Sequence, residues 1–460
     1  MNCSFLRFVY LSVFLNLLLV GCSGGESGTG MTASESKASV GVITGFGSVY
    51  VNGDKFDTSG AEINVNDAAA VEADLSIGMV VTIVGTQSRG TAKAHAIYYE
   101  SEVCGIVSQN NQDGTLDIMG QTVKYDSETV FESDDLTITV IEDIPMDAVV
   151  EISGYRTGDN NLHATRIALV SDVYAIGEEL AVKGIVTAGL SNGKFSMGSL
   201  TVAVDSATKF IDMPNQQITQ GMVVKVKSKR AVLHNELQAD TIKSGTNDHV
   251  AVGSMVEIEG IVMNPLMDSN EFQLNGFTVY FSNQTDFDGG IASDLADGVK
   301  AEVEGVLLSA NQIEANEISF RKTARLELIA PATSIDDNQV DVSGVAVHLT
   351  SKTLLKDDDK ATKVRRFSLA DLSVGDTVKI KAYKDNLSGE VVATQFRRKE
   401  AVLSGTPSTT FELSGVLDEL NNRQVVISGV AIDRSQVTEL TSEEIGTQAT
   451  ARGTIPITVQ

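Results

Sequence analysis

The alternation of apolar and polar positions along the chain follows one short pattern that recurs six times. Each copy has two apolar residues two positions apart, then a glycine, then another apolar residue. Period-two alternation is typical of a β-strand with one buried face, and glycine accepts the positive φ of a tight hairpin turn. The pattern therefore predicts six β-hairpins. The glycine position holds Gly53, Gly120, Ser199 (with Gly198 beside it), Gly276, Gly344 and Gly429.

Two further features follow each hairpin. The first is a Leu-x-x-Gly step, with variations in the second and sixth copies, and it opens another strand. The second is an alanine three residues before Ile or Phe, which predicts a tight packing contact. The sixth copy lacks this alanine, so it is expected to be incomplete or to be completed by a strand from elsewhere. The first feature lies at Gly78, Asp147, Gly221, Gly298, Gly375 and Gly446, and the second at Ala94, Ala164, Ala239, Ala315 and Ala393.

A polar step also recurs directly after the hairpin. We expect its hydroxyl and carboxylate groups to cap a local turn, and a repeated row of ligand-binding groups is the alternative. The step runs from 126 to 129, 205 to 208, 282 to 285 and 350 to 353.

No segment has sustained helical periodicity, and strands recur every 8 to 15 residues. Five or six short strands in each unit predict an all-β chain, a tandem array of about six small barrels of OB or SH3-like type. Neighbouring barrels are expected to pack together or to continue each other's sheets. The predicted boundaries are 1–21 (signal peptide), 22–39 (tether), 40–100, 101–176, 177–248, 249–323 and 324–400 (repeats 1 to 5), and 401–460 (repeat 6, degenerate or incomplete).

The N-terminus predicts export and a lipid anchor. Arg7 precedes an apolar run over 8–20, which is too short to span a bilayer comfortably but suits a signal peptide. The run ends in Leu19-Val20-Gly21-Cys22, which resembles a bacterial lipobox. In proteins with that motif the chain is cleaved after Gly21, and Cys22 carries the lipid. An ordinary signal peptide and a short membrane anchor are the alternatives.

The segment 22–39 is rich in Gly, Ser, Thr and Glu and is predicted to be a flexible tether. Ser23 resembles the residue that follows the cysteine in lipoproteins sorted to the outer membrane. We therefore expect a cell-envelope protein anchored in the outer membrane, with either face as its location.

The first repeat reads Gly-Val-Ile-Thr-Gly-Phe-Gly-Ser-Val-Tyr-Val-Asn-Gly over 41–53, followed by Leu75-x-x-Gly78. It resembles a family of tandem β-barrel domains of unknown function in bacterial secreted lipoproteins. The resemblance covers roughly residues 40–400 and weakens toward the last copy. It implies small OB-like barrels outside the cytoplasm and brings no catalytic residues.

The charge balance restricts the partners. The 460 residues include 35 Lys and Arg against 61 Asp and Glu, a formal charge of −26. Binding to nucleic acid needs surplus positive charge to displace counterions from phosphate, so no nucleic-acid partner is expected. Three cysteines exclude a disulfide-stapled scaffold. With Cys22 lipidated, Cys104 is expected to lack a partner in the chain and to be a small buried residue at a strand start.

Residue types that carry catalysis are present but not arranged for it. The five histidines occupy different repeat positions without metal-ligand spacing, and each is expected in an exposed strand or loop. The sequence has no HExxH or CxxC motif. The acidic run 357–359 is expected to remain solvated. The sequence therefore predicts no enzyme, no catalytic residue, no metal site and no cofactor.

One basic cluster stands out from the acidic background. Residues 321–400 hold 15 Lys and Arg against 12 Asp and Glu. A solvated loop is the simple interpretation of the cluster. The functional alternative is a contact for an anionic partner: lipid phosphates, an acidic glycan or an acidic neighbouring repeat. The cluster comprises Arg365, Arg366, Arg397, Arg398 and Lys399.

Three functions remain open. The favoured one is a lipid-anchored, non-enzymatic binding or scaffold protein that contacts the membrane through its N-terminal lipid and binds an unknown protein or glycan. The second is a carbohydrate-binding or adhesive surface lipoprotein, with Tyr98 and Tyr99 as the best stacking surface, since the chain has no tryptophan. The third, least favoured, is an envelope hydrolase.

Overall fold

The computed structural model describes residues 35–454 except 89–90, 134–137, 159–160, 214, 246–248 and 402–409. Gly21 and Cys22 lie outside the described residues. Among the residues described, no helix has the length and hydrophobicity to cross a bilayer. The first strand begins at Glu35, inside the segment expected to be tether, because its polar residues pair through their backbones with two other strands.

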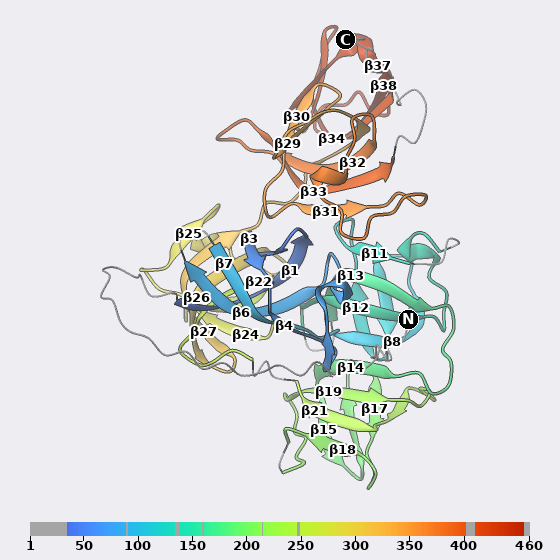
Figure 1. The fold of residues 1–460 in the computed structure, drawn as a ribbon, viewed down its shortest axis with the longest axis vertical. Coiled ribbons are helices and arrows are strands. Elements are labelled where there is room, and N and C mark those ends of the chain that lie inside the picture. Colours follow the sequence, from blue (N-terminus) through green and yellow to red (C-terminus); the bar gives the residue numbers. More distant parts are fainter. Residues whose placement is uncertain are drawn as a thin grey trace, which may run out of the picture.

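The described residues form six β-units, called barrels 1 to 6 (Figure 1). Barrel 1 contains β1 (Glu35–Gly45), β2 (Val49–Val51), β3 (Asp54–Asp57), β4 (Glu62–Val65), β5 (Ala68–Ala70), the 3₁₀ helix η1 (Glu72–Asp74), β6 (Val80–Ser88) and β7 (Thr91–Tyr99). Barrel 2 contains β8 (Val103–Asn110), β9 (Thr115–Ile118), β10 (Gln121–Lys124), β11 (Val130–Glu132), η2 (Ile141–Asp143), β12 (Val149–Arg156) and β13 (Asn161–Ser171). Barrel 3 contains β14 (Leu180–Ile185), β15 (Ala188–Ser191), β16 (Lys194–Met197), β17 (Leu200–Ala203), β18 (Lys209–Ile211), β19 (Val223–Ser228), β20 (Glu236–Gln238) and β21 (Thr241–Ser244).

The C-terminal half repeats this order. Barrel 4 contains β22 (Met255–Leu266), β23 (Glu271–Leu274), β24 (Phe277–Tyr280), β25 (Asp286–Asp288), η3 (Ala292–Asp294), β26 (Lys300–Ser309) and β27 (Gln312–Phe320). Barrel 5 contains β28 (Leu326–Ile335), β29 (Gln339–Val342), β30 (Val345–His348), β31 (Leu354–Asp357), η4 (Leu369–Asp371), β32 (Thr377–Lys384) and β33 (Val391–Glu400). Barrel 6 contains β34 (Thr410–Leu420), β35 (Gln424–Ile427), β36 (Val430–Asp433), η5 (Arg434–Gln436), β37 (Val437–Leu440) and β38 (Gln448–Thr454).

Each complete barrel closes in the same strand order. In barrel 1, β1 pairs antiparallel with both β2 and β6, β3 runs parallel to β7, and β6 pairs with β7. Barrels 2, 4 and 5 repeat this order, and barrel 3 follows it with its first and last strands each broken in two. This is the topology of the five-stranded OB barrel. The predicted all-β array of small OB-like barrels is confirmed.

Barrel 6 departs from this order within the described residues. There β37 pairs antiparallel with β38, whereas in barrel 5 the strands β30 and β31 both run parallel to β33.

The Leu-x-x-Gly step has the same structural role in all six barrels. Gly78 has φ 88°, and its N–H donates to the carbonyl of Ile43 at the end of β1, while the Ile43 N–H donates to Met79. Asp147 adopts the same left-handed conformation in barrel 2, which a short polar side chain tolerates better than most. The step therefore begins the closing strand and fastens it to the first strand.

The six barrels are joined in three pairs, each through the first strands of both members. Strand β1 pairs parallel with β22, β8 pairs antiparallel with β14, and β28 pairs antiparallel with β34. Barrels continue each other's sheets as expected, but barrel 1 pairs with barrel 4 rather than with its sequence neighbour (Figure 1).

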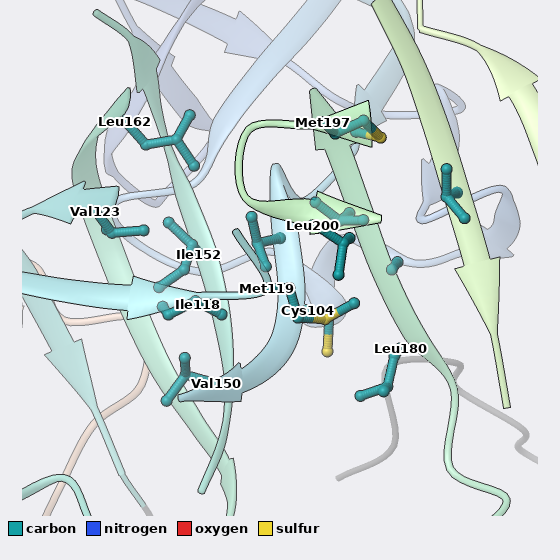
Figure 2. Packing of buried hydrophobic residues seen from close by; sticks show 14 of the residues in the cluster. Cys104, Ile118, Met119, Val123, Val150, Ile152, Leu162, Leu180, Met197 and Leu200 are labelled. Carbon is teal, nitrogen blue, oxygen red and sulfur yellow. The ribbon is translucent and has the colours of Figure 1, made fainter. Parts of the chain in front are cut away.

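Barrels 2 and 3 share one hydrophobic core. Figure 2 shows Met197 and Leu200 of barrel 3 beside Cys104 and Met119 of barrel 2. Cys104 is fully buried at the second residue of β8, as expected. Cys104 is disulfide-bonded, whereas the expectation for a chain with Cys22 lipidated is that it lacks a partner; the chain's other cysteines lie outside the described residues.

The recurring polar step is a turn cap that reaches across the barrel. Thr353 Oγ1 accepts from the N–H of Thr350 at 2.9 Å and donates to the carbonyl of Ala393 at 2.7 Å. The same two bonds occur at Thr129, Thr208 and Thr285, each to the alanine of the closing feature. Two recurring features of each unit, the polar step and the alanine, thus meet in one hydrogen-bonded contact, and the turn-capping interpretation is correct.

Replacing Thr353 by valine keeps its shape but removes both bonds. Thr353 is buried, so a backbone N–H and a carbonyl lose their partner, and we expect the free energy of unfolding of barrel 5 to fall by about 2 kcal/mol. Urea denaturation measures the loss. Thr362→Val, on an exposed loop of the same barrel, is the control, and equal stability of the two variants would contradict the assignment.

Candidate functional site

The densest polar cluster lies where barrels 1, 2, 4 and 5 meet. It is the glutamate cluster, which comprises Glu257 and Glu259 on β22 and Glu302 and Glu304 on β26. The hydroxyl of Tyr155, on β12, donates to Glu259 at 2.6 Å. Burial disfavours ionised Glu259, but the charges of Arg321 and Lys300 outweigh it and lower its pKa. Glu259 is therefore a buried anion shared between two barrels.

Arg321 connects this anion to its neighbour. Its guanidinium binds Glu259 and lies 2.8 Å from Glu302. Lys352, from barrel 5, lies 3.1 Å from the same Glu302 carboxylate. Ion pairs thus join barrels 4 and 5, and the hydrogen bond from Tyr155 connects barrel 2 to them.

The other half of the cluster faces barrel 1. Lys37 on β1 lies 2.9 Å from Glu257, and the hydroxyl of Ser39 donates to Glu257 at 3.1 Å. Burial and the charge of Glu302 raise the pKa of Glu257 to about 8, against the opposing charge of Lys37.

Within the described residues, Glu257, Glu302 and Glu304 are the acidic group whose oxygens lie close enough to hold a metal ion, within 4.8 Å of one another. Lys37 and Lys352 already stand against these carboxylates at ion-pair distance. The cluster is therefore an ion-pair network, with Lys37 and Lys352 supplied by other barrels.

A second network joins barrels 1, 2 and 5. Glu151 on β12 accepts from the hydroxyl of Tyr99 and from Arg166, both at 3.0 Å. Arg166 also binds Glu132 at 2.8 Å, and Arg365 of barrel 5 lies 3.3 Å from Glu132. Burial opposes ionisation of Glu132, but the charges of Arg166 and Arg365 lower its pKa to about 2.

A third cluster joins barrels 1 and 3. Lys227 and Lys243 lie 2.8 and 2.9 Å from Asp67, in the β4–β5 turn. Lys225 is almost fully buried, with Asp67 and Glu100 at 3.8 and 3.7 Å, and burial lowers its pKa. Sequence reasoning missed this cluster, because its members come from different repeats.

The structure places Arg365 and Arg366 against acidic residues of other barrels. Arg365 meets Glu132, as above, and Arg366 lies 3.0 Å from Glu72 of barrel 1 with its guanidinium over the ring of Phe46. An acidic neighbouring repeat is one of the partners that the sequence suggested for this cluster.

The other three basic residues follow along β33. Arg397 lies 3.5 Å from Asp358 and donates to the carbonyl of Thr129 in barrel 2. Arg398 is buried against Asp357, over the ring of Phe367. Lys399 is exposed.

The acidic run 357–359 differs from its prediction. Asp357 and Asp359 are 2% and 3% exposed. Asp357 binds Arg398, and Asp359 accepts from the N–H groups of Ala361, Thr362 and Ala401. The expectation of a solvated loop is wrong, because the compensating cation stands on another strand.

The predicted stacking surface is also occupied. Tyr99 is 1% exposed and bonded to Glu151. Tyr98 stacks on His249, with ring centroids 3.7 Å apart and planes 2° apart. These tyrosines offer no free platform for a sugar.

A groove of about 740 Å³ lies at one end of barrel 5. One side is the β28–β29 loop, and the other is η4. Its rim carries Asp336, Asp337, Asn338, Gln339 and His348, and its floor is Ile335, Leu369 and Ala370.

In barrel 2 the corresponding cleft is closed by hydrogen bonds. Ser108 in barrel 2 and Thr333 in barrel 5 each donate a hydrogen bond to the second strand of their own barrel, at 2.9 Å in both, so these two residues correspond. Two positions further along each chain segment, Asn110 therefore corresponds to Ile335. The Asn110 amide donates to the carbonyls of Ile141, Glu142 and Ile144 in and after η2, at 3.1 to 3.2 Å. An isoleucine makes no such bonds, so the cleft of barrel 5 stays open.

Comparison with known proteins bears on four of the barrels. The family described as "Domain of unknown function (DUF5666)" matches residues 105–168, 183–243, 262–319 and 331–395, which lie in barrels 2 to 5 and make up more than half of the chain. No curated protein sequence matches the chain. A solved structure titled "drosophila Unr CSD456" is 11% identical and covers 47% of this chain and 96% of that chain, with a TM-score of 0.11. A TM-score that low carries no argument.

Proposed function

The chain belongs to the family of the domain of unknown function DUF5666, and from this premise we propose that it is a lipid-anchored, non-enzymatic scaffold of the cell envelope. The observation that carries the proposal is that its buried ionic groups join one barrel to another. Glu302, Glu132 and Asp67 each bind a cation that stands on a different barrel. A rigid body that presents loops to a partner needs this arrangement.

The same observation disfavours a hydrolase. General acid–base catalysis needs a carboxyl group that reaches substrate in a suitable protonation state. Within the described residues, the buried carboxylates of the three clusters face guanidinium or ammonium groups instead.

The anchor is tested by lipid labelling. We expect the native chain to incorporate radiolabelled palmitate and to fractionate with the outer membrane, and Cys22→Ser to lose both properties. Cys3→Ser, which changes a residue of the signal peptide, is the matched control and is expected to keep both. Unlabelled native chain in the soluble fraction would overturn the anchor.

The mass of the extracted native chain adds an independent readout. The sulfur of Cys22 carries either a lipid or a disulfide, so the proposal requires the mass of the chain from Cys22 onward plus acyl groups. Protease treatment of intact and permeabilised cells then assigns the face. Digestion in intact cells would indicate partners outside the cell, and protection would indicate partners in the periplasm.

A further inference from the structure

We propose that the groove of barrel 5 is a binding site for a neutral saccharide. The inference rests on the proposed function, because it gives the scaffold a ligand class and a place to bind it. The groove lies between the loop that joins the first two barrel strands and the 3₁₀ helix. In OB barrels the loop between the first two strands borders the surface that binds oligosaccharides and oligonucleotides.

Barrel 5 lacks the contacts that occupy this place in barrels 1 and 2. In barrel 2 the amide of Asn110 ties the corresponding loop to η2. In barrel 1 the equivalent position is filled by Phe46, which is buried in that barrel's own core. Ile335 in barrel 5 neither bonds to η4 nor fills the space, so the groove remains, with a volume typical of small-ligand sites.

The lining combines two kinds of surface that a sugar ring requires. The rim offers the carboxylates of Asp336 and Asp337 and the amide of Asn338, and no hydrogen bond or ion pair of these side chains occurs among the residues that the structure describes. These groups accept from and donate to hydroxyls. Leu369 and Ile335 supply an apolar floor against which the C–H face of a sugar packs.

Charge selects against the other ligands of OB barrels. The two rim carboxylates and Glu390, whose Oε1 lies 3.9 Å from Nε2 of His348, give the groove an excess of acidic side chains. A nucleic acid or an acidic glycan would be repelled. A bare cation would use the carboxylates alone and leave the amides and the apolar floor without a role.

The test is isothermal titration of the folded chain with linear gluco-, manno- and galacto-oligosaccharides of three to six units. We expect one series to bind, Asp336→Asn with Asp337→Asn to weaken it about tenfold, and Ile335→Asn to abolish it by closing the groove as in barrel 2. Asp268→Asn, on the exposed β22–β23 loop of barrel 4, is the matched control. Thermal melting checks that every variant is folded.

Two results would overturn the site. One is no saccharide binding by the folded chain. The other is binding of calcium chloride, lost in Asp336→Asn, in place of saccharide binding. Either result leaves the lipid label and the membrane fractionation untouched, so this inference and the proposed function fail separately.

Discussion

Replacement of Arg321 by methionine is expected to lower the free energy of unfolding by about 3 kcal/mol. Arg321 is the shared cation of Glu259 and Glu302, which are both nearly buried. Methionine replaces the apolar stem of arginine and carries no charge, so the packing of the stem is kept while two buried carboxylates lose a partner. Lys300 and Lys352 remain at 3.1 Å from these carboxylates. Because they still compensate part of the negative charge, the expected loss of stability is at the lower end of the range for breaking a buried ion pair.

Urea denaturation gives the total loss, and hydrogen exchange places it. A chain of six barrels is not expected to unfold in one step, so faster exchange in β22 and β26 is the specific readout. Arg325→Met, four residues along the chain and exposed, is the control. Adding Glu302→Gln to Arg321→Met should recover part of the loss, because it removes one unpaired charge. Identical exchange in the native chain and Arg321→Met would refute the role of the cluster.

The repeated elements could be predicted from the sequence because their causes are local. The hairpin glycines, such as Gly276 with φ 87°, take a conformation that few residues adopt. The step at Gly298 begins a strand in the expected place, and its N–H bonds to Val262 at the end of the first strand. Spacing along the chain reveals such features, because both partners lie in the same unit of about 75 residues.

The pairing of barrels could not be predicted. The first strands share one kind of alternation between apolar and polar residues, so the pattern gives no reason for β1 to choose β22 over β8. The choice depends on complementary charges, such as Lys37 against Glu257, that lie 220 residues apart. The acidic run 357–359 was misinterpreted for the same reason, since Arg398 is 41 residues from Asp357 along the chain.

The groove of barrel 5 could be predicted from the sequence only in part. The sequence aligns Asn110 with Ile335 once the repeats are matched, but the consequence is visible only when the amide is found on the carbonyls of η2. A comparison between repeats of one chain therefore carries functional information, because the residue that closes the cleft in barrel 2 is replaced by isoleucine in barrel 5.

Acidification from about pH 5 to about pH 2 is expected to lower the free energy of unfolding by about 3 kcal/mol through Glu132 alone. The pKa of Glu132 falls from its ordinary value of 4.5 to about 2 in the folded chain, because Arg166 and Arg365 outweigh the effect of burial. The unfolded chain therefore takes up this proton first. The stabilisation is complete above about pH 5 and is lost as the pH falls through the folded value.

Glu132→Gln isolates this contribution from the other acidic groups. Asp126, for example, also has a pKa lowered to about 2, against burial, by its bond to His163, so the native chain loses stability in acid for more than one reason. We expect Glu132→Gln to be less stable than the native chain near pH 7 and to converge with it near pH 2. Urea midpoints across this range measure the difference, and hydrogen exchange in β11 localises it. Asp143→Asn, on the exposed side of η2, should run parallel to the native chain, whereas a parallel curve for Glu132→Gln would mean that Arg166 and Arg365 stabilise nothing through Glu132.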